Sequence, residues 1–198
     1  MAPRMFNHNR GLWGYTGAYS GDGEPLTIQA TGLGGPSAAI VLEELAALGL
    51  RRAIRVGTAT ALEATLALGE LLVVERALCA DGTSAALGAL GEVEADAALL
   101  AALRREGGGA LASGAVVSSD LFYESGAERL AGWRERGARA LELASAALFA
   151  LGARRDVAVG CVVAISARTG EEERLAAEGL AEAGFAAGRV AAAALTES

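Results

Sequence analysis

The chain has 198 residues, of which 53% are hydrophobic and 21% charged, and its formal net charge is −7. This length supports one hydrophobic core and is short for two, so we expect a single domain over residues 1–198. The negative charge argues against a nucleic-acid partner, and no apolar run is long enough for a membrane span. With a polar, glycine-rich N-terminal sequence that lacks signal-peptide features, we expect a soluble cytoplasmic protein.

Few side chains are available for metal or nucleophile chemistry. The sequence contains no Lys, so an anion site would be built from Arg forks, backbone amides and hydroxyls. Cys79 and Cys161 lie far apart and show no disulfide or metal pattern, and His8 is the only histidine. We therefore expect no metal site and no site that needs two histidines.

Short apolar runs alternate with amphipathic stretches along the chain. The first half predicts, in order, a strand at Leu26–Thr31, a glycine turn, a helix at Ser37–Leu48, strands at Arg52–Val56 and Leu71–Leu78, and a surface loop at Asp81–Gly91. The second half predicts a helix at Glu94–Arg105, a strand at Ala110–Val117, a helix at Glu128–Arg136, a short extended segment at Ala138–Leu141, a helix at Leu143–Leu151, a strand at Val157–Ile165, a helix at Glu171–Ala183, and more helix from about Phe185. This alternation indicates an α/β fold, a three-layer αβα sandwich around a mixed, mostly parallel central sheet.

Ligands of such sheets gather at the carboxyl ends of strands, and three strand ends carry suggestive residues. The turn Gly32-Leu-Gly-Gly-Pro-Ser37 opens a helix whose amides could hold an anion or a ribose oxygen, or it serves only tight packing. In Arg55-Val-Gly-Thr58, a strand-end Arg needs an anion or an internal carboxylate as its partner. Ser118-Ser-Asp-Leu-Phe-Tyr123 is either a polar turn with base-stacking aromatics or a capping Asp beside a core aromatic pair.

In this order, these segments resemble the nucleoside phosphorylase family that includes uridine phosphorylase and the hexameric bacterial purine nucleoside phosphorylase. The resemblance runs from about Asn9 to Thr169 and includes Arg10-Gly-Leu-Trp-Gly-Tyr-Thr-Gly17. It implies the nucleoside phosphorylase fold and cleavage of an N-glycosidic bond by inorganic phosphate, giving free base and pentose 1-phosphate. The co-substrate is phosphate, and no other cofactor is expected.

The resemblance also implies roles for individual residues. Phosphate would be bound by Arg55, Thr58 and, from a neighbouring subunit, Arg10. The base and ribose would be bound by Gly34, Phe122, Tyr123, Arg129, Glu142 and Arg168. Arg129 and Arg168 resemble the pair that grips a pyrimidine, although each is equally consistent with a surface or ion-pair residue.

Three departures from the family pattern bear on activity. The first ten residues are too short for the family's opening strand and Gly-Asp-Pro loop, so we expect part of the phosphate site to be missing, unless the start is mis-assigned. Ala144 stands where the family has a ribose-binding carboxylate, a contact that Glu142 or Ser145 would replace in part. Ala167 stands where the purine branch has a proton-donating Asp, which favours a pyrimidine substrate.

Two hypotheses remain open at this point. The first is a divergent phosphorylase of a pyrimidine nucleoside or a sugar-modified analogue, with no catalytic residue assigned. The second is a non-catalytic relative that binds a nucleoside, a base or an anion. Because family sites borrow residues from a neighbour, we expect a homo-oligomer, a dimer or hexamer, in either case.

Overall fold

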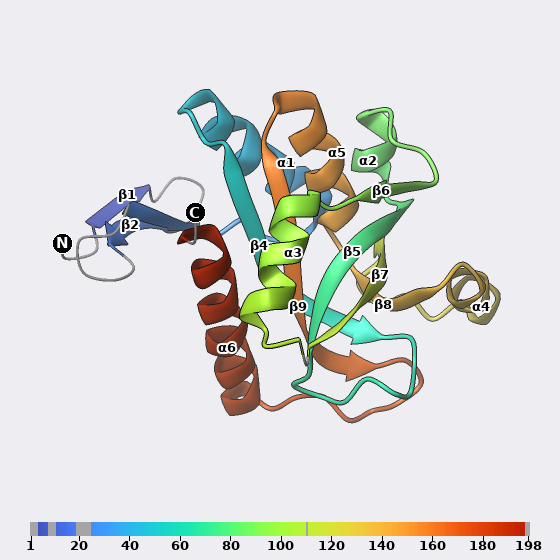
Figure 1. Cartoon of the computed structure of the whole chain (residues 1–198). Helices are drawn as coiled ribbons and strands as arrows, with labels where there is room; N and C mark the ends of the chain where they lie inside the picture. Colours follow the sequence, from blue (N-terminus) through green and yellow to red (C-terminus); the bar gives the residue numbers. More distant parts are fainter. Residues whose placement is uncertain (1–3, 8–10, 19–24, 110, 197–198) are drawn as a thin grey trace.

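The computed structural model describes residues 4–7, 11–18, 25–109 and 111–196, and it contains two sheets (Figure 1). The smaller sheet is antiparallel and three-stranded, with β1 (Arg4–Asn7), β2 (Gly14–Ala18) and β3 (Pro25–Gln29). It lies at one side of the molecule, with α4 (Ala127–Glu135) at the opposite side (Figure 1).

The larger sheet has six strands in the order β6-β5-β7-β8-β4-β9. Their bounds are β4 (Arg52–Ala61), β5 (Leu71–Ala80), β6 (Glu92–Glu94), β7 (Ala112–Ser119), β8 (Ala138–Glu142) and β9 (Ala158–Arg168). The pairs β4–β9, β5–β7 and β7–β8 are parallel, whereas β4–β8, β5–β6 and β5–β9 are antiparallel. Because β5 also pairs with β9, the strands β5, β7, β8, β4 and β9 form a closed ring.

Helices cover both faces of this sheet (Figure 1). One core cluster packs α1 (Gly34–Ala47) and α5 (Ser145–Arg155) against the sheet, and another packs α3 (Ala97–Glu106) and α6 (Ala177–Thr196). Alternate residues of β9 enter the two clusters, as expected for a strand buried on both faces. The expected α/β class, with a mixed central sheet between helices, is confirmed.

Several boundaries differ from the expectations, each because of a pairing or a cap. Strand β4 runs past the expected end at Val56 because it pairs with β9 along its whole length, so Gly57 and Thr58 lie inside a strand. The expected loop after β5 contains a short helix, α2 (Gly82–Ala86), capped by the Asp81 carboxylate. The helix expected from Glu171 begins later and runs unbroken through Phe185, because the segment before it bridges back to β9.

Among the described residues, no helix combines the length and the apolar character that crossing a membrane requires.

Candidate functional site

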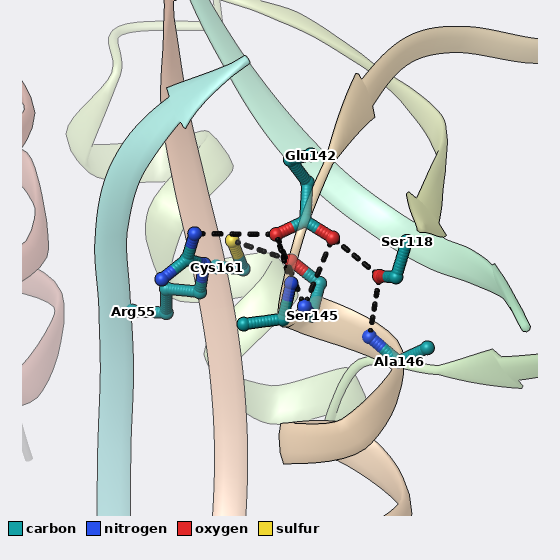
Figure 2. A network of polar contacts seen from close by, with 7 residues as sticks. Arg55, Ser118, Glu142, Ser145, Ala146 and Cys161 are labelled. Atoms are coloured by element: carbon teal, nitrogen blue, oxygen red, sulfur yellow. Dashed lines mark hydrogen bonds and ion pairs between the residues drawn. The ribbon is translucent and has the colours of Figure 1, made fainter. Parts of the chain in front are cut away.

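Arg55 and Glu142 form a buried ion pair between two neighbouring strands (Figure 2). Arg55 lies in β4, Glu142 is the last residue of β8, and these strands pair antiparallel. The Arg55 Nη2 atom is 3.2 Å from Glu142 Oε2, and the side chains are 15% and 0% exposed. A buried carboxylate of this kind is tolerated only with close cationic or hydrogen-bonding partners.

The Glu142 carboxylate is also bound by the first turn of α5. The backbone N–H of Ala144 donates to Oε2 at 2.8 Å, and that of Ser145 donates to Oε1 at 2.9 Å and Oε2 at 3.1 Å. These amides have no partner inside the helix, and the helix dipole favours a negative charge at this position. Glu142 therefore serves as the N-terminal cap of α5, a role that Ala144, the N-cap residue, cannot take with its own side chain.

Two buried serines and a thiol complete this network, as Figure 2 shows. The Ser118 hydroxyl donates to Glu142 Oε1 and accepts the N–H of Ala146 at 2.8 Å. Ser145 Oγ lies 3.3 Å from Cys161 Sγ. Burial raises the pKa of the Cys161 thiol to about 12, so it stays protonated at neutral pH.

A glycine in β4 leaves room for the Arg55 side chain. A Cβ on Gly57 would lie 2.9 Å from Arg55 Nη2 and 3.1 Å from Cζ, so the guanidinium occupies the space that a side chain would fill. Within the described part of the chain, the buried Nε of Arg55 has no hydrogen-bond partner. The guanidinium is thus held at one nitrogen and has unused donor capacity.

The glycine turn before α1 lies beside this network. Gly34 has φ +78, and a Cβ on Gly35 would lie 3.3 Å from Cβ of Ala147 in the first turn of α5. The N-cap residue Leu33 supplies no side-chain cap, so no side chain at the cap satisfies the first amides of α1. Thr58 is exposed on β4, and the alternation of a strand directs it to the face opposite Arg55.

The loop that follows β7 carries the two expected aromatic residues. Phe122 and Tyr123 are 57% and 82% exposed, and their rings meet edge to face with centroids 4.8 Å apart. They are therefore not a core pair. Asp120 accepts the N–H of Gly82 at 2.7 Å, which fastens this loop to the start of α2.

Both arginines that were expected at the base form ion pairs with nearby carboxylates. Arg129 Nη1 lies 3.0 Å from Oε2 of Glu124, a side chain that is 4% exposed. Arg168 Nη1 lies 2.9 Å from Glu171 Oε2, and its Nε donates to the Leu66 carbonyl at 3.3 Å. The ion-pair alternative raised from the sequence therefore holds for this structure, and a role at the base stays a prediction.

The structure brings together Arg55, Glu142 and the glycine turn near the start of α5, whereas Arg10 lies outside the described residues. Sequence reasoning did not identify Ser118 as a partner of Glu142, although Glu142 ends β8 and Ser118 is one residue from the end of β7. The sheet order was the missing information, because β7 and β8 are neighbours and Ser118 stands opposite Glu142 in their register.

A surface groove of about 520 Å³ lies elsewhere, between the carboxyl ends of α1 and α5. It is lined by Glu43, Ala46, Ala47, Arg51, Arg155 and Asp156. The Arg55–Glu142 pair lies at the amino end of α5, about three helical turns away, so the groove is separate from the buried network.

Comparison with known proteins gives a consistent result. A family model described as the phosphorylase superfamily matches residues 3–197. The chain is 33% identical over 149 residues to a guanosine phosphorylase of Halorubrum lacusprofundi, covering 73% of this chain and 61% of that protein. It is 30% identical over 172 residues to a uridine phosphorylase of Escherichia coli, covering 77% and 67%. It is 34% identical over 169 residues to a DeoD-type purine nucleoside phosphorylase of Streptococcus pyogenes, covering 81% and 70%. The chain thus spans less than two thirds of the first of these relatives and about two thirds of the others.

Proposed function

The chain belongs to the phosphorylase superfamily, and we propose that it is a nucleoside phosphorylase. In the proposed reaction an oxygen of inorganic phosphate forms a bond to the anomeric carbon of a nucleoside. The bond from that carbon to the base nitrogen breaks, and its electron pair leaves with the base, which takes a proton from solvent. The products are free base and pentose 1-phosphate.

The observation that carries this proposal is the fixed cation of Arg55. Its guanidinium is held at one nitrogen by Glu142, keeps 15% of its side chain exposed, and has a buried Nε without a partner. A partly dehydrated, oriented guanidinium is well suited to a phosphate oxygen, because little reorganisation is needed on binding. Arg10, supplied by a neighbouring subunit, completes the proposed phosphate site by its resemblance to a family residue, whereas Thr58, the other residue that the resemblance suggested, lies on the face of β4 opposite Arg55.

We propose a pyrimidine nucleoside as the preferred substrate. Arg129 and Arg168 would bind the base, with Phe122 and Tyr123 beside the base or sugar and Gly34 at the ribose. The Arg168–Glu171 pair is partly exposed on both sides, at 27% and 43%, so a base can compete for Arg168 at modest cost. Arg129 is 56% exposed but its partner Glu124 is only 4% exposed, so Arg129 would bind a base while staying beside Glu124. Ala167 carries no proton donor for a purine leaving group, which supports the same preference.

A homo-oligomer is part of the proposal. Large apolar side chains are exposed on β2, β3 and α1 or directly before them, and these elements follow one another in the chain; the residues are Trp13, Tyr15, Ile28, Leu33 and Ile40. Exposed large apolar side chains are typical of a protein interface where they lie together. A second copy of this chain is the partner we propose, since a shared site would require one.

The second candidate is a non-catalytic relative that binds a nucleoside or an anion. It is favoured by Ala144, which has no carboxylate to offer a sugar, and by Glu142, whose oxygens are occupied by protein donors. Thermal unfolding with uridine, thymidine, adenosine or inosine, each with and without phosphate, separates the two candidates. A nucleoside shift that grows with phosphate supports the phosphorylase, whereas a saturable shift indifferent to phosphate supports the binding protein.

A further inference from the structure

The oxygens of Glu142 have no capacity left for a substrate hydroxyl. An ionised carboxylate offers about four lone-pair sites. Those of Glu142 face the Ser118 hydroxyl, the amides of Ala144 and Ser145, and the Arg55 guanidinium. The side chain is 0% exposed, so a ligand arriving from solvent reaches Arg55 and not the carboxylate behind it.

The partners of Glu142 differ in how freely they can move. Two are backbone amides in the first turn of α5, and the third is a fully buried serine that is itself bound to the Ala146 amide. Arg55 is the flexible partner, with a long side chain that loses rotamer freedom when held. The carboxylate is therefore fixed by the fold, and it is Arg55 whose direction is set by the contact.

From these observations we infer that Glu142 is a positioning residue, which directs the Arg55 guanidinium towards phosphate and does not bind the sugar. This inference rests on the proposed function and reassigns Glu142 from the ribose to the phosphate side of the site. Glu142 offsets part of the Arg55 charge, but it holds the guanidinium in place before phosphate arrives. Orientation of this kind lowers the cost of binding and of reaching the transition state.

The test compares KM for phosphate with KM for nucleoside in Glu142→Asp, which keeps the charge and withdraws the carboxylate by one methylene. The exposed pair Glu43–Arg155 supplies a control variant, Glu43→Gln. We expect KM for phosphate to rise at least about tenfold in Glu142→Asp, because ångström-scale misplacement of a binding group has effects of this size. KM for nucleoside should stay within about twofold, and Glu43→Gln should resemble the wild type.

Other outcomes of this assay overturn the inference. A rise in KM for nucleoside with unchanged KM for phosphate would assign Glu142 to the sugar. A lower unfolding temperature with both KM values unchanged would leave Glu142 as a helix cap alone. In an Arg55→Ala background, Glu142→Asp should add no further loss of phosphate kcat/KM, since its effect passes through Arg55; additive losses would contradict the inference.

Gly57→Ala is a second variant, which tests the inference if Glu142→Asp does not fold. It should displace the Arg55 side chain and leaves the Glu142 side chain unchanged. The new Cβ would stand 2.9 Å from Arg55 Nη2, at the end of a flexible side chain, so the guanidinium must shift while the strand need not. We expect KM for phosphate to rise, while Glu142 remains bound by Ser118 and the α5 amides. An unchanged KM for phosphate would mean that the direction of Arg55 is unimportant.

A measurement that needs no turnover separates this inference from the proposed function. The Nε–H group of Arg55 can be followed by nitrogen-15 NMR relaxation in the ligand-free protein. We expect it to be rigid in the wild type and Glu43→Gln and mobile in Glu142→Asp. If no nucleoside is cleaved but this pattern holds, the proposed function fails and the positioning of Arg55 stands. If Arg55 remains rigid in Glu142→Asp, the positioning fails whether or not phosphorolysis occurs.

Discussion

Ser118 and Glu142 stand opposite each other at the ends of the parallel strands β7 and β8, and the serine hydroxyl donates to the carboxylate. The same hydroxyl accepts the N–H of Ala146 in the first turn of α5. One side chain thus ties two strands and a helix to the carboxylate that holds Arg55. The stability of the fold and the geometry of the candidate site therefore depend on the same contact.

Replacing Ser118 by Ala should destabilise the fold by about 1–3 kcal/mol, because it leaves the Ala146 amide without an acceptor in a fully buried position. Denaturant-induced unfolding measures this loss. Ser119→Ala is the matched control, since Ser119 is a buried neighbour whose hydroxyl accepts the N–H of Leu121, a residue that is 50% exposed. Equal losses in the two variants would contradict the role given to Ser118.

Cys161 should make stability fall at alkaline pH. Burial raises its pKa from 9.0 to about 12. Between these two pH values the thiol keeps its proton in the folded state and loses it in the unfolded state. The stabilisation is complete below about pH 9 and is lost as pH rises towards 12, at up to about 1.4 kcal/mol per pH unit. Unfolding measured from pH 8 to 11 should decline more steeply in the wild type than in Cys161→Ala. Parallel curves would show that the thiol does not titrate this way.

Removing Arg168 should weaken nucleoside binding and leave phosphate binding unchanged. A charge-assisted hydrogen bond to the base is worth about 1.5–3 kcal/mol, so KM for nucleoside should rise about ten- to a hundredfold in Arg168→Gln. Arg154→Gln, at an exposed arginine on α5 that donates to the Leu87 carbonyl, is the control. A KM for nucleoside that does not change would restrict Arg168 to its ion pair with Glu171.

A charge on the apolar surface of α1 should disrupt the proposed assembly. Ile40 is 49% exposed on that helix, and Leu90, which is 81% exposed after α2, offers a control position. Light scattering should give the wild type a mass that is a multiple of 19.9 kDa and Ile40→Glu a smaller one, with Leu90→Glu like the wild type. A monomeric wild type would contradict the shared site.

The sequence predicted the elements whose pattern is local. Strand β9 is buried on both faces and therefore reads as an almost continuous apolar run, and the glycine turn with Pro36 marks the start of α1 within a few residues. The run of β4 beyond Val56 was not predicted, since Gly57 and Thr58 are typical of a turn. Its length is imposed by pairing with β9, and local propensity does not encode that pairing.

The candidate site, like the fold, could be predicted from the sequence only in part. An Arg in an apolar strand, as Arg55 is, was enough to predict a carboxylate or anion partner, but the choice between them was open. The partner, Glu142, is distant in sequence and is brought close by the antiparallel pair β4–β8. Ser118 and the α5 amides donate hydrogen bonds to Glu142 because of the order of the strands, and one sequence does not specify that order.

The most direct test of the proposed function is release of free base from a panel of nucleosides, measured with and without inorganic phosphate in the wild type and in Arg55→Ala. We predict that one pyrimidine nucleoside is cleaved only when phosphate is present, with pentose 1-phosphate formed in equal amount, and that Arg55→Ala loses most of this activity. Absence of cleavage across the panel, or cleavage that is independent of phosphate and survives in Arg55→Ala, would contradict it.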